Sequence, residues 1–159
     1  MTESETITPL SLRELGWNNF FQQQVDHENE LIPARVSRQD LGRYHLMSEE
    51  GLLIGILQGK ARLGTSKADL PTVGDWVLVK AQEQGDEYII HETLERATKF
   101  SRKEAGEKFN EQVVAANIDT VFIVTGLDDN FNARRIERYL FLCNTSGALP
   151  VIVLNKVDL

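Results

Sequence analysis

The chain has 159 residues, of which 42% are hydrophobic and 26% charged, and its net charge is −7 at pH 7. This composition is ordinary for a soluble globular protein with one domain, or with one small domain and part of another. No apolar run approaches the ~20 residues that cross a bilayer. The single cysteine, Cys143, excludes an internal disulfide framework and a cysteine-rich zinc site. We therefore expect a cytoplasmic protein with no membrane partner, no bound DNA and no metal ligands in this chain.

Residues 1–30 are predicted to form a helical extension. A short helix is suggested over residues 11–25, because Ser11 and Glu14 have the spacing of a capping box. Gly16 weakens this helix. We expect the extension to pack on the domain that follows it.

Residues 31–97 show short apolar segments separated by turn residues at intervals of about ten residues, a pattern typical of a small barrel or sandwich. An OB-fold-like Greek-key barrel is the favoured architecture, and such barrels often bind oligonucleotides. Trp17 and Trp76 are expected to pack in the interior rather than to stack on bases. The predicted strands cover residues 32–36, 43–47, 52–57, 76–80 and 88–91.

Residues 98–112 are interpreted as a joint, and basic side chains gather in and next to it. They could contact phosphates, since charges farther away than about 8–10 Å are screened, or they could belong to a solvated linker of mixed charge. The sequence does not decide between the two. The candidate RNA contacts in this region are Arg96, Lys99, Arg102 and Lys103, followed around the barrel by Arg35, Arg43, Lys60 and Arg62.

Residues 113–159 read as strand, helix and strand. The strands are predicted at 120–125 and 151–154, and the helix covers 133–143, with Gly147 ending it. This pattern is that of one βαβ unit with parallel strands. Cys143 is expected to be a small core residue rather than a nucleophile.

The second strand of this unit runs directly into Asn155-Lys156-x-Asp158, a spacing used for guanine recognition. The carboxylate of Asp158 could accept hydrogen bonds from the guanine N1–H and 2-amino groups, whereas adenine would leave it unsatisfied. Asn155 could fix the loop, and the aliphatic stem of Lys156 could cover one face of the base. The position also fits, because open α/β sheets bind ligands at the carboxyl ends of their strands.

A phosphate loop G-x-x-x-x-G-K-[ST] normally precedes this motif in GTP-binding proteins, and the sequence contains none. Either the guanine motif is accidental, or the phosphate loop follows it in a longer protein with permuted motif order. A translation-factor-like GTPase in the usual order is disfavoured. We interpret the chain as a fragment that is catalytically silent by itself.

Several segments together resemble the RsgA (YjeQ) family of circularly permuted GTPases that depend on the small ribosomal subunit. They include Leu70-Pro-x-Val-Gly-Asp-Trp-Val77, Gln112-Val-Val-Ala-Ala-Asn-Ile-Asp119, Asp129-Asn-Phe-Asn132 and residues 151–159. The resemblance implies an OB-fold-like RNA-binding barrel at 31–97, then a joint, then the start of a truncated permuted P-loop GTPase domain at 113–159. Only Asn155, Lys156 and Asp158 map onto the family's nucleotide site.

The resemblance further implies binding of GTP or GDP with Mg²⁺, contact with the small (30S) ribosomal subunit and its 16S rRNA, and a role in the late maturation of that subunit. Mg²⁺ ligands and a zinc module would lie outside these residues. The truncated sheet is expected to associate with another copy or to be poorly protected from exchange. The alternative is a standalone RNA-binding OB-fold module without enzymatic activity.

Overall fold

The structure is a computed structural model that describes residues 9–26, 30–57, 69–103 and 111–158. It divides into two compact units, Met1–Arg96 and Ala97–Leu159, which are described separately below. None of the helices in the described ranges is long and apolar enough to cross a membrane.

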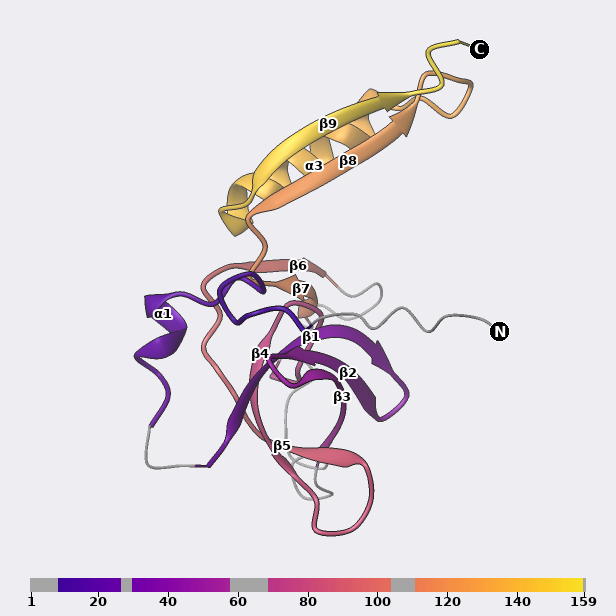
Figure 1. Ribbon diagram of the computed structural model, residues 1–159. Helices are drawn as coiled ribbons and strands as arrows, with labels where there is room; N and C mark the ends of the chain where they lie inside the picture. The colour runs from indigo at the N-terminus through magenta and orange to yellow at the C-terminus, as the bar shows by residue number, and fades with distance from the viewer. Residues whose placement is uncertain (1–8, 27–29, 58–68, 104–110, 159) are drawn as a thin grey trace, which may run out of the picture. The chain divides into compact units, whose positions relative to one another are not determined.

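The first unit is a closed five-stranded barrel with the strand order β1-β2-β3-β5-β4 (Figure 1). Neighbouring strands are antiparallel except β3 and β5, which are parallel. This connectivity is that of an OB-fold, so the predicted architecture is confirmed. The strands are β1 (Ile32–Asp40), β2 (Arg43–Ser48), β3 (Gly51–Leu57), β4 (Trp76–Ala81) and β5 (Glu87–Thr93).

Strand β4 is apolar on both of its faces, and the two faces serve different cores. Val77 and Val79 point into the barrel, while Trp76 and Leu78 belong to a second cluster outside it. Since side chains alternate along a strand, one uninterrupted apolar run supplies both cores. The residues buried inside the barrel are Ala34, Val36, Tyr44, Leu46, Leu53, Val77, Val79 and Ile90.

The N-terminal clasp, residues 11–25, covers the outer cluster. Leu15 and Phe21 of the clasp are buried together with Trp76, Leu78 and Leu94. The ring of Trp17 packs edge-on against that of Trp76, with 4.7 Å between their centroids. The predicted packing role of both tryptophans is therefore confirmed.

The helix predicted over residues 11–25 is wrong in extent. Ser11 and Glu14 do form the reciprocal capping hydrogen bonds, from Ser11 N to Glu14 Oε2 (2.9 Å) and from Glu14 N to Ser11 Oγ (3.4 Å). The turn that they begin ends at Gly16, whose φ of +95° cannot continue a right-handed helix. A separate helix of one turn, α1 (Asn19–Gln22), starts after the N-cap residue Asn18.

The second unit begins with an antiparallel pair, β6 (Lys99–Lys103) and β7 (Glu111–Ala116). The sequence patterns do not predict these strands, because the segment lacks apolar alternation and is rich in charge. Residues 98–112, interpreted as a joint, thus contain the whole of β6 and the first two residues of β7.

The predicted βαβ unit follows. Strands β8 (Thr120–Gly126) and β9 (Leu149–Asn155) are parallel, and α3 (Ala133–Ser146) runs along one face of the pair (Figure 1). Asn132 caps α3, and Gly147 ends it in the left-handed conformation, with φ +78°. Cys143 is fully buried, and burial raises the pKa of its thiol, as expected for a packing residue.

The face of β8 opposite to α3 is apolar and open. Ile123 and Thr125 are buried beneath the helix, whereas Phe122 and Val124 on the other face are 66% and 64% exposed. Parallel strands are normally covered on both faces. The second unit therefore presents an apolar sheet surface of the kind expected from the sequence.

Candidate nucleotide-binding site

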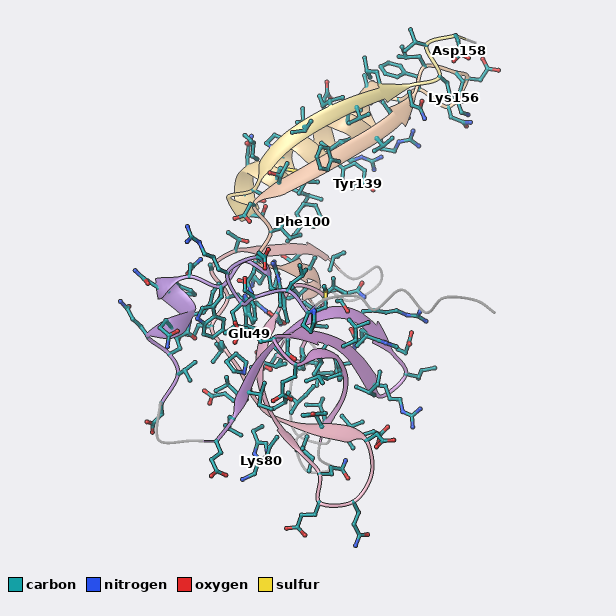
Figure 2. The ribbon with its side chains drawn as sticks, viewed as in Figure 1. Glu49, Lys80, Phe100, Tyr139, Lys156 and Asp158 are labelled. Carbon is teal, nitrogen blue, oxygen red and sulfur yellow. The ribbon has the colours of Figure 1, made fainter. Side chains whose placement is uncertain are left out.

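The guanine motif lies where both parallel strands end. Asn155 is the last residue of β9 and is in register with Gly126, the last residue of β8. The carbonyl of Asn155 accepts a hydrogen bond from the N–H of Leu127 (3.0 Å), which joins the two loops that leave the strands. Figure 2 shows Lys156 and Asp158 beyond these strand ends. The motif thus occupies the edge at which open α/β sheets bind ligands.

The turn after β9 is fixed by its own side chains. The side-chain oxygen of Asn155 accepts a hydrogen bond from the backbone N–H of Lys156 at 2.9 Å. Lys156 has φ +57°, in the left-handed region that costs a non-glycine residue about 1–2 kcal/mol. Strained backbone of this kind concentrates at functional sites. The side chain of Asn155 thus contacts the backbone of the residue that adopts this unusual conformation.

The ammonium of Lys156 is bound by a residue that the sequence analysis does not single out. Its Nζ lies 2.6 Å from Oδ2 of Asp128, in the loop after β8. The ammonium of Lys156, and then the backbone N–H of Asn130, hold the pKa of Asp128 below its usual value. Residues 129–132 enter the sequence analysis only through the family resemblance, and Asp128 is not considered there. The signal that could have pointed to Asp128 is an acid two residues after a strand that is parallel to the strand before the guanine motif.

Asp158 is exposed in the turn that follows Lys156. An exposed carboxylate at a strand edge can reach the donor pair of a purine that approaches from solvent. The three motif residues are thus brought together at one edge, with Asn155 turned toward the backbone of the loop and Asp158 toward solvent.

Two of the candidate RNA contacts, Arg96 and Arg35, make contacts inside the barrel unit. The guanidinium of Arg96 grips the fully buried carboxylate of Asp75, from Nε to Oδ1 at 2.8 Å and from Nη2 to Oδ2 at 2.7 Å. It also donates to the carbonyl of Leu70 at 3.0 Å, and its side chain is only 15% exposed. Arg35 donates to the carbonyl of Leu15 and lies over the ring of Trp76, 5.8 Å from its centroid. This geometry argues against phosphate contact by either arginine, because each is committed to the folding of the barrel and clasp.

Of the other candidate RNA contacts, two have described side chains, and these are exposed. Arg43 is exposed and pairs with Glu87 at 2.9 Å, and Lys99 is exposed on β6. Arg102 and Lys103 lie on the same strand, but their side chains are outside the described part. Lys60 and Arg62 lie outside the described residues altogether.

No group of three or more His, Cys, Asp or Glu side chains that could hold a metal ion occurs among the residues that the structure describes. His45, one of the three histidines, instead contacts Asp40 at 2.9 Å on the barrel surface.

The fold agrees with those of solved permuted GTPases. The crystal structure of YloQ, a circularly permuted GTPase, matches with a TM-score of 0.57 and 19% identity, over 84% of this chain and 44% of that one. The structure of YjeQ from Thermotoga maritima matches with a TM-score of 0.58 and 24% identity, over 80% of this chain and 42% of that one. The barrel and the βαβ unit therefore share their fold with part of YloQ, a circularly permuted GTPase, and with part of YjeQ.

Sequence relatives narrow this class. The family model described as RsgA GTPase matches residues 93–159. The small ribosomal subunit biogenesis GTPase RsgA of Opitutus terrae is 42% identical over 165 residues, which cover 94% of this chain and 44% of the relative. RsgA 2 of Vibrio vulnificus is 42% identical over 163 residues, which cover 100% of this chain and 42% of the relative. The chain is therefore similar to RsgA proteins over nearly its whole length, and it spans less than half the length of these relatives.

Proposed function

We propose that this chain supplies the guanine-recognition edge and the RNA-binding barrel of a cytoplasmic GTPase that acts in the maturation of the small ribosomal subunit. The observation that carries the proposal is the placement of Asn155, Lys156 and Asp158 at the carboxyl end of a parallel strand. The names of the relatives, small ribosomal subunit biogenesis GTPases, support the rest.

Each motif residue has a role that its position supports. The carboxylate of Asp158 accepts from the N1–H and 2-amino groups of guanine, and this pair of donors distinguishes guanine from adenine. Asn155 holds the loop through the backbone of Lys156. The stem of Lys156 covers a face of the base, as long basic side chains do on apolar surfaces.

Hydrolysis of GTP requires more than base recognition. The γ-phosphate, Mg²⁺ and the attacking water must all be positioned, and the 159-residue sequence has no phosphate loop to do so. We therefore assign GTP hydrolysis, the Mg²⁺ site and any zinc module to residues beyond those present here. The chain alone binds nucleotide weakly and does not turn it over.

The guanine assignment is tested by replacing one hydrogen-bond acceptor, a carboxylate oxygen of Asp158, with an amide donor. In the complete gene product, Asp158→Asn should weaken GDP binding roughly 10- to 100-fold, the loss expected for a charge-assisted contact. The same change should strengthen binding of xanthosine diphosphate, because an amide can accept from N1–H and donate to the 2-oxo group. Asp129→Asn, which removes one charge from a neighbouring exposed loop, is the matched control. Equal GDP binding by both variants would contradict the assignment.

The ribosomal part is tested by co-sedimentation of the 159-residue chain with small ribosomal subunits at low and moderate salt. We expect salt-sensitive binding that is lost on Arg102→Glu with Lys103→Glu. The charge-matched control is Arg13→Glu with Arg38→Glu, two exposed positions on the clasp and on β1. Loss in both variants would indicate a general charge effect. Salt-sensitive RNA binding by a complete gene product that binds no GDP would favour a standalone RNA-binding module instead.

A further inference from the structure

The loop that follows β8 is built around the carboxylate of Asp128. Its Oδ1 accepts a hydrogen bond from the N–H of Asn130 at 3.0 Å, and its backbone carbonyl accepts from the N–H of Phe131 at 2.8 Å. A Cβ added at Gly126 would lie 3.1 Å from both carboxylate oxygens, so the glycine leaves the space that this carboxylate occupies. Asp128 is therefore held in place by its own loop.

The second oxygen of this carboxylate points to the guanine motif. Oδ2 of Asp128 contacts Nζ of Lys156 at 2.6 Å, the short distance of a charge-assisted hydrogen bond. The backbone of Lys156 is fixed at the other end by its left-handed φ and by the side chain of Asn155. A lysine stem with both ends fixed has few conformations left, although the side chain remains 50% exposed.

We propose that Asp128 is a positioning residue for guanine recognition, which holds the ammonium of Lys156 so that the aliphatic stem lies ready to cover one face of the base. The inference rests on the proposed function and adds a residue to the same site. Pre-organising a long side chain improves affinity because the conformational freedom is lost before the ligand arrives rather than on binding.

A merely structural role for Asp128 makes a different prediction. If the carboxylate only joined the two loops, its removal would disturb Asp158 as well as Lys156, and the discrimination between purine edges would change. If it acts through the stem of Lys156, it affects stacking on the face of the base and leaves recognition of the edge unchanged. The affinities for two nucleotides that differ only at the edge of the base separate stacking on its face from recognition of its edge.

The test compares GDP with inosine diphosphate, which lacks the 2-amino group, in the complete gene product. Asp128→Asn should weaken binding of both nucleotides by the same factor, roughly three- to tenfold, as expected for one side chain that is no longer pre-organised. Lys156→Met keeps an unbranched stem without the ammonium and should have a similar effect. The double variant should bind no more weakly than Lys156→Met alone, because both changes remove one interaction. Asp129→Asn is the control and should leave both affinities unchanged.

Three results would overturn the inference. Asp128→Asn could match Asp129→Asn, its effect could multiply with that of Lys156→Met, or it could alter the ratio of GDP to inosine diphosphate affinity. If the unaltered protein still binds GDP, none of these three results contradicts the proposed function. If the unaltered protein binds neither nucleotide, the proposed function and this inference fail together.

Discussion

Arg96 offers the sharpest test of how the barrel is held together, because the sequence suggests a phosphate contact and the structure shows an internal ion pair. Arg96→Met would leave the carboxylate of Asp75 fully buried with the N–H of Thr72 (2.8 Å) as its remaining donor. Removing one partner of a buried pair typically costs about 3–5 kcal/mol, since the other charge stays desolvated and unpaired. That is a large part of the ~5–15 kcal/mol that stabilises a typical domain.

Urea unfolding followed by tryptophan fluorescence measures this cost, with Trp76 next to the pair as the main reporter. For a slope of about 1–3 kcal/mol per molar urea, a loss of this size lowers the midpoint by roughly 2 M. Arg38→Met is the control, because Arg38 is 69% exposed and pairs only with Asp40 at the surface. Its effect should stay within about 0.5 kcal/mol.

A second variant distinguishes the destabilisation caused by the unpaired charge of Asp75 from that caused by the lost packing of Arg96. Adding Asp75→Asn to Arg96→Met removes the orphaned charge and keeps an acceptor for Thr72, so part of the lost stability should return. The reasoning is refuted if Arg96→Met costs no more than about 0.5 kcal/mol, the range of ordinary surface substitutions. If such a stable variant also lost binding to the ribosomal subunit, Arg96 would be a phosphate contact after all.

Three further predictions follow from the contacts described above. Phe21→Ala should destabilise the barrel unit by about 3–5 kcal/mol in thermal or urea unfolding, whereas Phe20→Ala, half exposed on the same helix, should cost much less. Lys156→Met should raise the pKa of Asp128 toward that of an ordinary aspartate, as followed by NMR of its carboxyl carbon. In the unaltered chain the ion pair should persist above the usual Asp pKa and disappear as the pH falls through the lowered one. Amide hydrogens of residues 113–159 should exchange faster than those of the barrel in a monomer, and equal protection would contradict the open apolar face as a source of weakness.

The barrel strands could be predicted because each carries its own signal. Segments such as Trp76–Ala81 are apolar and lie between turn residues, and the glycines mark where strands change direction. Strand β6 has no such signal, since Lys99–Lys103 reads as a charged linker and becomes a strand only by pairing with β7. The N-terminal helix was overpredicted because a correct capping pair at Ser11 and Glu14 starts a turn that Gly16 then ends.

In the candidate site, too, residues that are adjacent in the sequence could be predicted, whereas contacts between residues far apart in the sequence could not. The motif Asn155-Lys156-x-Asp158 could be found because the residues stand together in the sequence after a recognisable strand. Asp128 was missed, since its contact with Lys156 depends on the register of the parallel pair, which places Gly126 opposite Asn155. The ion pair of Arg96 is also absent from the sequence prediction, because its partner Asp75 lies in the turn before β4, far from Arg96 in the sequence.

The distribution of charge bears on where an RNA could approach. Residues 1–96 contain nine lysines and arginines and sixteen acids, whereas residues 97–159 contain eight of each, which together make the 17 and 24 of the whole chain. The entire net charge of −7 therefore falls on the barrel unit, where Arg35 and Arg96 are also bound internally. Phosphates are repelled by such a surface except where basic groups stand locally free of acids. We infer that the basic residues of β6, which lie in the neutral unit, are better candidates for RNA contact than the acidic barrel unit as a whole.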